Sequence, residues 1–258
     1  MRKTVLITGA SSGIGLELAR LFARDGYDLV IVARRREVLQ RVAQELQVAC
    51  NVSVTAVAKD LAMPGAAEEL VEELRREGLH LDALVNNAGF ATYGRFTETD
   101  LATELQLMQL NMVTLTALTK LLLPDMLARG EGKILNVAST AAFQPGPLMA
   151  VYYASKAYVL SFSEALANEL RGTGVTVTAL CPGITRSGFQ ARAGLEDSRL
   201  LRMGLMDAAT VAHIGYRGLM RNHTVVIPGL KHRLLTFAVR LTPRNVVTRI
   251  VRMIQERA

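Results

Sequence analysis

Short hydrophobic runs alternate with amphipathic stretches along most of this chain. The runs are nearly continuous in apolar residues, which is typical of strands in a parallel sheet covered on both faces. The stretches between them repeat their apolar residues with a helical period. Strands are predicted over Thr4–Thr8, Asp28–Ala33, Val52–Ala58, Leu81–Asn86, Lys133–Ala138, Val175–Cys181 and Thr224–Ile227, and helices over Gly13–Arg24, Arg35–Ala49, Ala66–Glu77, Asp100–Arg129, Ala150–Arg171 and Asp207–Met220.

Repeated strand–helix units predict a doubly wound parallel sheet, that is, a Rossmann-type α/β fold with right-handed crossovers. No linker rich in Pro, Gly or Ser divides the chain, so one domain over residues 1–258 is expected. The segment Ile184–Met206 has few apolar periods, and we interpret it as a mobile substrate segment. The tail Leu230–Ala258 is basic and partly amphipathic.

The formal net charge is +7, and a basic balance can indicate nucleic acid, a membrane surface or an anionic ligand as partner. The basic clusters are not interleaved with aromatic residues and the chain has no Trp, which disfavours nucleic acid. The tail could meet anionic lipid or an anionic acyl carrier. An ordinary solvated helix or a subunit contact is the interpretation that the tail's pattern favours.

Two cysteines and four scattered histidines show no metal-ligand spacing, so no metal site is predicted and the thiols are expected to be free. The first predicted strand begins at Thr4, which leaves no room for a signal peptide. No apolar run looks long enough to span a bilayer. A cytoplasmic location is therefore expected.

A glycine-rich turn joins the first predicted strand to the first helix and reads Thr8-Gly9-Ala10-Ser11-Ser12-Gly13-Ile14-Gly15. Glycines allow unusual backbone angles and remove side chains where a pyrophosphate, and then the helix, must approach closely. The helix N-terminus offers N–H groups and partial positive charge to a phosphate. The spacing differs from the G-x-G-x-x-G of ordinary dinucleotide folds, and a tight turn without a ligand is the alternative.

The end of the second predicted strand bears on which dinucleotide would bind. In dinucleotide-binding folds an acidic residue there binds the ribose 2′-hydroxyl and disfavours a 2′-phosphate. This strand is followed by Arg34, Arg35 and Arg36, with no carboxylate. Because arginine suits bidentate phosphate binding, the sequence favours NADP over NAD. The alternative is a solvated first turn of helix, which fits Arg36 better than Arg34 or Arg35.

Tyr152 and Lys156 are four residues apart on a predicted helix and therefore share a face. An ammonium near a phenol stabilises the phenolate and lowers the pKa of the phenol, which would suit Tyr152 to proton exchange. Ser139 follows the fifth strand, at the edge of the sheet where ligands bind in such folds. Tyr153 competes for the role, but it precedes Lys156 by three residues.

Taken together, these motifs resemble those of the short-chain dehydrogenase/reductase family, in order and over roughly residues 3–189. The glycine-rich turn corresponds to the family's T-G-x-x-x-G-x-G motif. The other correspondences are Asn86-Asn87-Ala88-Gly89 for N-N-A-G, Ser139 with Tyr152 and Lys156 for the serine and Y-x-x-x-K, and Pro182-Gly183 for the later P-G motif.

The resemblance implies a role for each matching residue. Tyr152 would be the acid–base group, Lys156 would lower its pKa and hold the nicotinamide ribose, and Ser139 would position the substrate oxygen. Asn111 matches the asparagine that supports a water-mediated proton relay, and Ser187 stands where the family has a later threonine. The implied cofactor-binding residues are Gly9, Ser11, Ser12, Gly13, Ile14, Gly15, Arg34, Arg35, Asp60, Leu61, Asn87, Ala88, Gly89, Tyr152, Lys156, Pro182, Gly183, Ile184 and Thr185.

The resemblance also implies an NADP(H)-dependent oxidoreductase acting on a ketone, aldehyde, 3-ketoacyl or steroid-like carbonyl or the matching alcohol. It implies a homodimer or homotetramer paired through the helices Asp100–Arg129 and Ala150–Arg171. A catalytically silent binding or regulatory protein with this fold is the alternative. Side chains expected near the substrate, with ordinary packing as the alternative, are Tyr93, Phe143, Gln144, Met149 and Phe189.

Overall fold

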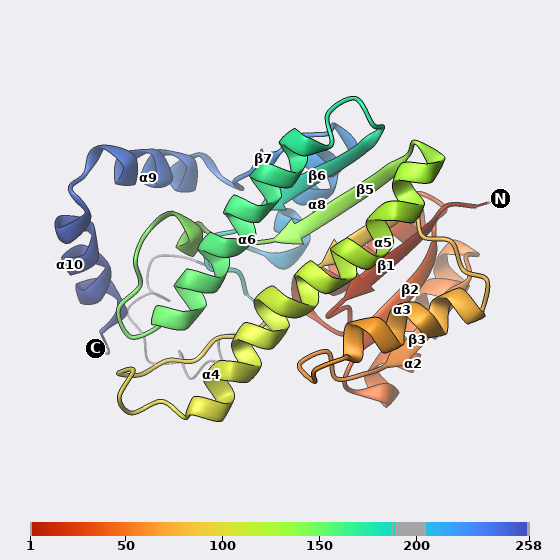
Figure 1. The fold of residues 1–258 in the computed structure, drawn as a ribbon, viewed down its shortest axis with the longest axis horizontal. Helices are drawn as coiled ribbons and strands as arrows, with labels where there is room; N and C mark the ends of the chain where they lie inside the picture. The colour runs from red at the N-terminus through yellow and green to blue at the C-terminus, as the bar shows by residue number, and fades with distance from the viewer. Residues whose placement is uncertain (1, 187, 189–204, 257–258) are drawn as a thin grey trace.

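The computed structural model describes residues 2–186, 188 and 205–256, and it confirms the doubly wound α/β fold (Figure 1). Seven parallel strands form one sheet in the order β3-β2-β1-β4-β5-β6-β7. The order reverses between β1 and β4, which is where such sheets bind ligands. The strands are β1 (Thr4–Thr8), β2 (Asp28–Ala33), β3 (Val54–Ala58), β4 (Ala83–Asn86), β5 (Gly132–Val137), β6 (Val175–Leu180) and β7 (Val225–Val226).

Helices cover both faces of the sheet, which explains why the strands are mostly apolar. In β1, Val5 and Ile7 pack into the core formed with α1, α2 and α8. Leu6, between them, points to the other face and packs with α3 and α5. The helices named here are α1 (Gly13–Arg24), α2 (Arg36–Cys50), α3 (Ala66–Arg76), α5 (Leu115–Arg129) and α8 (Ala208–Met220).

The predicted helix Asp100–Arg129 is broken in the middle by one wide turn. It consists of α4 (Leu101–Met108), a π-helical turn η1 (Gln109–Thr114) and α5. By length and composition this stretch is apolar enough to cross a membrane. Its α5 part lies on the sheet, where Leu118, Leu122 and Met126 are buried in the core, while Leu101, Leu105 and Val113 before it are exposed. The α5 part is therefore a core element.

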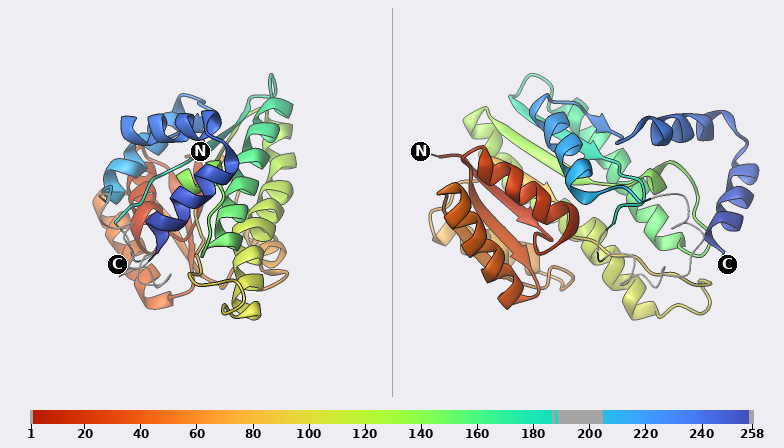
Figure 2. Two further views of the ribbon diagram at one scale, coloured as in Figure 1. Left: turned by 90° about the vertical axis from the view of Figure 1, so that its left-hand side faces the viewer. Right: turned by 180° about the vertical axis from the view of Figure 1, so that it is seen from behind.

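The basic tail forms two further helices, α9 (Leu230–Leu241) and α10 (Arg244–Gln255). They lie at the side of the molecule toward which β5 points, and Figure 2 (left) looks directly onto them. The short η2 turn (Thr140–Phe143) and helix α6 (Ala150–Glu169) complete the described elements. Where the observed end of a strand or helix differs from the predicted end, the two are one or two residues apart. Such differences are expected, because the hydrogen bonds that define an element need not end where its apolar pattern ends.

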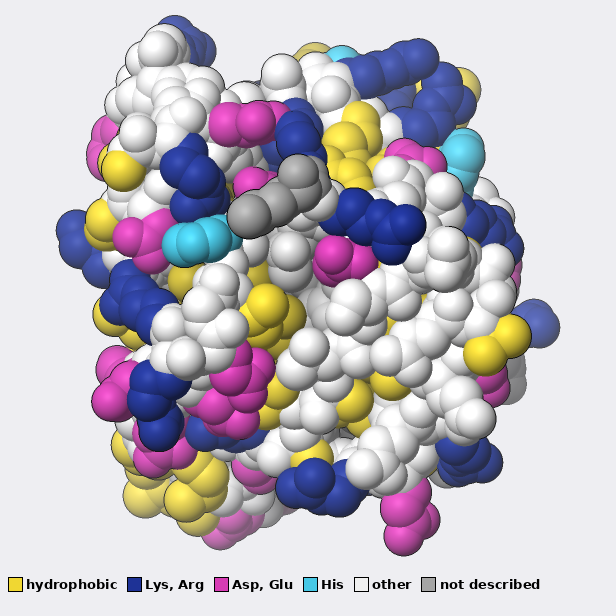
Figure 3. Space-filling view, turned by 90° about the vertical axis from the view of Figure 1, so that its right-hand side faces the viewer, with side chains coloured by type: hydrophobic (Ala, Val, Ile, Leu, Met, Phe, Trp, Pro, Cys, Tyr) yellow, Lys and Arg dark blue, Asp and Glu magenta, His cyan; other side chains and the backbone are white. Residues whose placement is uncertain are grey.

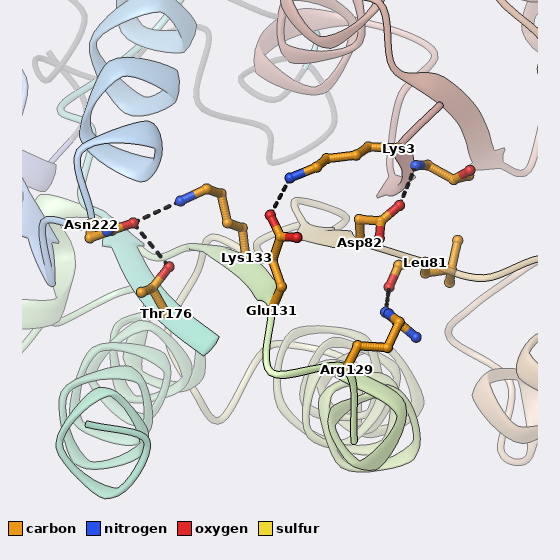
Figure 4. Close-up of polar contacts among 9 residues, drawn as sticks. Lys3, Leu81, Asp82, Arg129, Glu131, Lys133, Thr176 and Asn222 are labelled. Carbon is orange, nitrogen blue, oxygen red and sulfur yellow. Dashed lines mark hydrogen bonds and ion pairs between the residues drawn. The ribbon is translucent and has the colours of Figure 1, made fainter. Parts of the chain in front are cut away.

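Polar contacts join the amino ends of the strands, at the opposite side of the molecule (Figure 4). The Asp82 carboxylate, just before β4, accepts a hydrogen bond from the Thr4 N–H at 2.7 Å. Lys3 pairs with Glu131, just before β5. Lys133 donates to the Asn222 side chain at 2.7 Å. Figure 3 shows this face, where basic and acidic side chains are interspersed.

Only the ends of the predicted substrate segment Ile184–Met206 are described. The Arg186 N–H donates to the Met206 carbonyl, and the Met206 N–H donates to the Ile184 carbonyl, both at 2.8 Å. These bonds form a parallel bridge between Thr185 and Met206. Ser187, Phe189 and the residues up to 204 lie outside the described residues.

Candidate active site

The glycine-rich turn brings β1 and α1 unusually close together. Gly9 and Gly13 have φ angles of +70° and +59°, in the left-handed region that favours glycine. Gly15, in the first turn of α1, faces the Gly9 backbone so closely that a Cβ there would lie 2.5 Å from the Gly9 carbonyl oxygen. The Ser12 side chain forms no capping hydrogen bond, so the first-turn N–H groups of α1 are not satisfied by a capping side chain.

The contact at Gly15 yields a stability prediction. Alanine normally stabilises a helix interior relative to glycine by about 0.5–1 kcal/mol. We expect Gly15→Ala to lower the free energy of unfolding by about 1–3 kcal/mol, because its methyl group meets backbone that cannot move without strain. Denaturant unfolding measures the change. A more stable variant would show that the approach of α1 to β1 is not tight.

Thr8 and Asn87 hold this turn against the end of β4. The Thr8 hydroxyl accepts hydrogen bonds from the N–H groups of Asn87 and Ala88, each at 3.0 Å. The Asn87 amide donates to the carbonyls of Thr8 and Gly9 at 2.9 and 3.2 Å. The N-N-A-G segment thus fixes the shape of the turn. Thr8 had no role in the sequence prediction beyond its place in the motif.

Ser139, Tyr152 and Lys156 meet beyond the carboxyl end of β5. Ser139 caps the start of η2, where its hydroxyl accepts a hydrogen bond from the Ala141 N–H at 3.1 Å. Tyr152 and Lys156 lie one turn apart on α6, and both are buried. The Lys156 ammonium donates to the Val137 carbonyl at 2.8 Å and lies 5.8 Å from the centre of the Tyr152 ring. The predicted residues are therefore close together in space.

The acidities in this cluster differ from the sequence-based expectation. Burial raises the pKa of the Tyr152 phenol above its ordinary value, and the hydrogen bond with Ser139 offsets part of the rise. Burial lowers the pKa of Lys156 to about 8. Desolvation therefore dominates the Tyr152 pKa, and the group that lowers it here is Ser139 rather than the expected Lys156. At neutral pH Tyr152 is a phenol, the form that can donate a proton.

Asn111 lies behind this cluster rather than on its surface. It sits in the π-helical turn, and its side-chain amide donates to the Phe90 carbonyl at 3.0 Å and the Ser155 hydroxyl at 3.1 Å. A Cβ on Gly89 would lie 2.9 Å from the Asn111 oxygen and 3.6 Å from the Lys156 nitrogen. Asn111 therefore supports the backbone next to Lys156, and the proton relay stays a prediction.

The glycine-rich turn and the cluster of Ser139, Tyr152 and Lys156 open into one cavity of about 2030 Å³. Every predicted cofactor-binding residue except Gly15 lines this cavity, and so does Ser139. Gly15 instead faces the backbone of Gly9. Tyr93 and Gln144 also line the cavity. Met149 and Phe143 do not, because Met149 packs beside Tyr152 and Tyr153 and Phe143 packs in the core around α6. Phe189 lies outside the described residues.

Arg34 and Arg35 lie at the cavity edge beyond β2. Both are exposed and line the cavity, whereas Arg36 begins α2 and does not line it. Asp60, across the same edge, uses its carboxylate to accept the Ala62 N–H at 3.0 Å. Lys59 also lines the cavity, but it pairs with Glu69 at 3.1 Å and with Glu73 at 3.8 Å, which favours the two arginines for binding a phosphate there.

Sequence reasoning missed the wall that the tail contributes. About half of the side chains involved are apolar, and they come from α9, α10 and the turn between them. Gln255 is fully buried and donates a hydrogen bond to the Tyr153 hydroxyl, while the Tyr93 hydroxyl donates to the Gln255 carbonyl at 2.7 Å. The tail's lining residues are Lys231, His232, Leu235, Thr236, Ala238, Val239, Thr242, Val247, Ile250, Val251, Ile254, Gln255 and Glu256.

No group of three or more His, Cys, Asp and Glu side chains that could hold a metal lies among the described residues. The site suits a dinucleotide instead. A side chain at Gly9 or Gly15 would clash with Asn87, and one at Gly89 would clash with Asn111, so glycine is required at each of these positions. The start of α1 lines the cavity and suits a pyrophosphate, and two arginines lie at the cavity edge.

Comparison with known proteins agrees with these features. The short chain dehydrogenase family matches residues 3–197. The chain is similar to the ketoacyl reductase HetN of Nostoc sp., with 32% identity over 226 residues, covering 87% of this chain and 78% of that protein.

Two solved structures share the fold over most of their length. A short-chain dehydrogenase from Sphingobium yanoikuyae in complex with NADPH is 36% identical, with a TM-score of 0.83 over 92% of this chain and 94% of that one. The bulky-bulky ketone specific alcohol dehydrogenase of Comamonas testosteroni is 32% identical, with a TM-score of 0.79 over 92% of each chain.

Proposed function

The chain belongs to the short-chain dehydrogenase family and is a dehydrogenase or reductase, and on that premise we propose that it is an NADP(H)-dependent reductase of bulky, largely apolar carbonyl compounds. One observation carries the proposal. The Ser139, Tyr152 and Lys156 cluster and the glycine-rich turn open into the same cavity, so a substrate oxygen and a dinucleotide can meet there.

The bound nicotinamide would supply the hydride in reduction or accept it in oxidation. The protein's own residues act on the substrate oxygen. Ser139 would hold the carbonyl oxygen by a hydrogen bond, and the Tyr152 hydroxyl would give its proton to that oxygen as the alcohol forms. Lys156, held by the Val137 carbonyl, would favour the phenolate left behind.

The size and chemistry of the cavity support a bulky substrate. Its volume of about 2030 Å³ must hold both cofactor and substrate, and the tail adds an apolar wall to it. The matched alcohol dehydrogenase from Comamonas testosteroni is specific for bulky-bulky ketones, and HetN is a ketoacyl reductase. We therefore favour ketones with two large substituents, or 3-ketoacyl compounds, over small aldehydes.

Preference for NADP is part of this proposal. Arg34 and Arg35 line the cavity, with no carboxylate at the end of β2 to bind the ribose 2′-hydroxyl. The matched structure from Sphingobium yanoikuyae carries NADPH. A cytoplasmic location and a homodimer or homotetramer stay predictions.

A substrate panel tests the reaction. Ketones of increasing size, 3-ketoacyl compounds and small aldehydes are each mixed with NADPH, and oxidation of the cofactor is followed by absorbance. We expect turnover to favour the bulky ketones or the 3-ketoacyl compounds. NADPH binding without turnover of any compound would favour the catalytically silent alternative. Faster turnover of small aldehydes would contradict the substrate class.

The acidity of Lys156 predicts a pH dependence. Its ammonium form prevails below a pKa of about 8 and is lost as the pH rises through that value. Tyr152 stays protonated over the same range, because its pKa is raised. We expect kcat/KM for carbonyl reduction to fall as the pH rises through about 8. A profile that stays flat across that value would show that the Lys156 charge does not assist the reaction.

A further inference from the structure

Helix α9 carries an apolar stripe on its outer face. Leu230, Leu234, Phe237 and Leu241 follow one another at intervals of four, three and four residues, which places them within about 60° of each other around the helix. Their exposed fractions are 71%, 60%, 59% and 75%. Four large apolar side chains in one exposed row are unusual on a monomer surface and indicate an interaction site.

Basic residues flank this stripe on both sides. Arg233 and Arg240 lie along one edge of it, and Lys231 lies on the other. Helix α10 repeats the pattern, with Val246, Ile250 and Met253 exposed at helical spacing and Arg249 beside them. Across residues 230–256 there are six Lys or Arg side chains and one carboxylate, Glu256, which pairs with Arg252.

Helices α9 and α10 pack against the rest of the protein through their inner faces. Thr236 on α9 is buried, as are Val247, Val251 and Gln255 on α10. Val247 and Val251 join the core cluster that contains Tyr152 and Tyr153. Ile250 also lines the cavity, but the four residues of the α9 stripe neither line it nor belong to a core cluster of the described residues, so packing does not explain their exposure. We call the outer surface of these helices the α9–α10 face.

The charge of the α9–α10 face differs from that of the opposite side. There, Lys3 pairs with Glu131, and Arg75 pairs with Asp125 at 3.1 Å. Basic and acidic side chains alternate over that surface, as Figure 3 shows. The α9–α10 face instead combines apolar rows with basic borders, which is the pattern of a helix that lies in a membrane interface.

The occupant must match both the apolar rows and the positive borders. A second copy docked symmetrically on this face would bring its row of arginines against the same row, and like charges would repel. Self-association has another apolar surface available on α4 and the π-helical turn, where Leu101, Leu105 and Val113 are exposed. An anionic bilayer satisfies both features, because acyl chains accept the leucines and phenylalanine while phosphates attract the basic side chains.

We propose that the α9–α10 face binds the surface of an anionic phospholipid bilayer. The inner sides of these helices line the cavity through Leu235, Val239 and Ile254, so docking brings the cavity wall next to the lipid surface. Binding to the bilayer does not require the proposed reaction. A direct binding assay therefore tests it separately from catalysis.

The assay measures sedimentation of the full chain with two kinds of vesicle. One kind is phosphatidylcholine alone, and the other is phosphatidylcholine mixed with phosphatidylglycerol. We expect binding to the mixed vesicles that weakens as salt is added, and at least tenfold weaker binding to the neutral ones. Equal binding to both kinds, or binding to neither, would overturn the proposal.

Two variant pairs separate the apolar and electrostatic parts. Phe237→Ser with Leu241→Ser removes apolar surface, and Arg240→Glu with Arg249→Glu reverses charge beside it. Each pair should lower the partition coefficient onto mixed vesicles on the order of 10²-fold. Matched controls on α2 and α3 are Val48→Ser, at a residue 82% exposed, and Arg41→Glu with Arg76→Glu. The controls should bind as the natural chain does.

Circular dichroism and light scattering without lipid complete the test. Because the altered side chains are exposed, each variant should keep the natural chain's spectrum and its oligomeric state. If Phe237→Ser with Leu241→Ser instead splits an oligomer, the face binds a second copy and the proposal is wrong. Loss of vesicle binding in the control variants to the same degree would also overturn it.

Discussion

Tyr152→Phe should lower the turnover number for carbonyl reduction by a factor on the order of 10² or more, because it removes the group that gives a proton to the substrate oxygen. The ring and its contact with Lys156 remain. We therefore expect cofactor affinity, measured by fluorescence titration with NADPH, to stay near that of the natural chain. Steady-state kinetics with the best substrate of the panel measures the loss.

Tyr153→Phe is the matched control, since it removes the same atom from the next residue. Its hydroxyl accepts a hydrogen bond from Gln255 rather than taking part in the Ser139 cluster. Loss of that bond should lower the free energy of unfolding by about 1 kcal/mol and leave the chemical step nearly unchanged. If Tyr152→Phe keeps near-normal turnover, or if Tyr153→Phe loses as much, the assignment of the proton donor is wrong.

Much of the fold could be predicted because its signals are local. The central strands of the parallel sheet are buried on both faces, so their apolar runs are visible in the sequence, as in Leu29 to Val32 of β2. The site motifs follow strand ends, and parallel strands end at one edge of the sheet. Residues as distant as Gly9 and Lys156 thus reach one cavity by topology alone.

The features that the sequence did not reveal depend on packing between distant segments. The π-helical turn around Asn111 continues the helices on either side without a Pro or Gly to mark it in the sequence. The burial of Gln255 depends on how α10 closes over Tyr153, which no local pattern reports. The pKa of Tyr152 follows from desolvation by its whole surroundings, whereas the spacing to Lys156 suggested only the charge effect.

Replacing both Arg34 and Arg35 by Ala should weaken NADPH binding on the order of 10- to 10²-fold and leave NADH binding nearly unchanged. The two cofactors differ only in the ribose 2′-phosphate, which is the group these side chains would bind. Both guanidinium groups lie on the exposed edge of the cavity, so their contribution is screened by solvent and stays moderate. Titration of both cofactors, on the natural chain and on the variant, gives the four dissociation constants needed.

Arg36→Ala is the control for general loss of positive charge near the site. Arg36 is the next residue and is equally exposed, but it begins α2 and does not line the cavity. It should change NADPH affinity much less than the double replacement does. Adding salt should weaken NADPH binding to the natural chain more than to the double variant, because ions screen the contact that the variant lacks. Tighter binding of NADH than of NADPH by the natural chain would show that the end of β2 selects NAD despite its arginines, and the proposed cofactor would then be wrong while the fold and the Tyr152 chemistry remained.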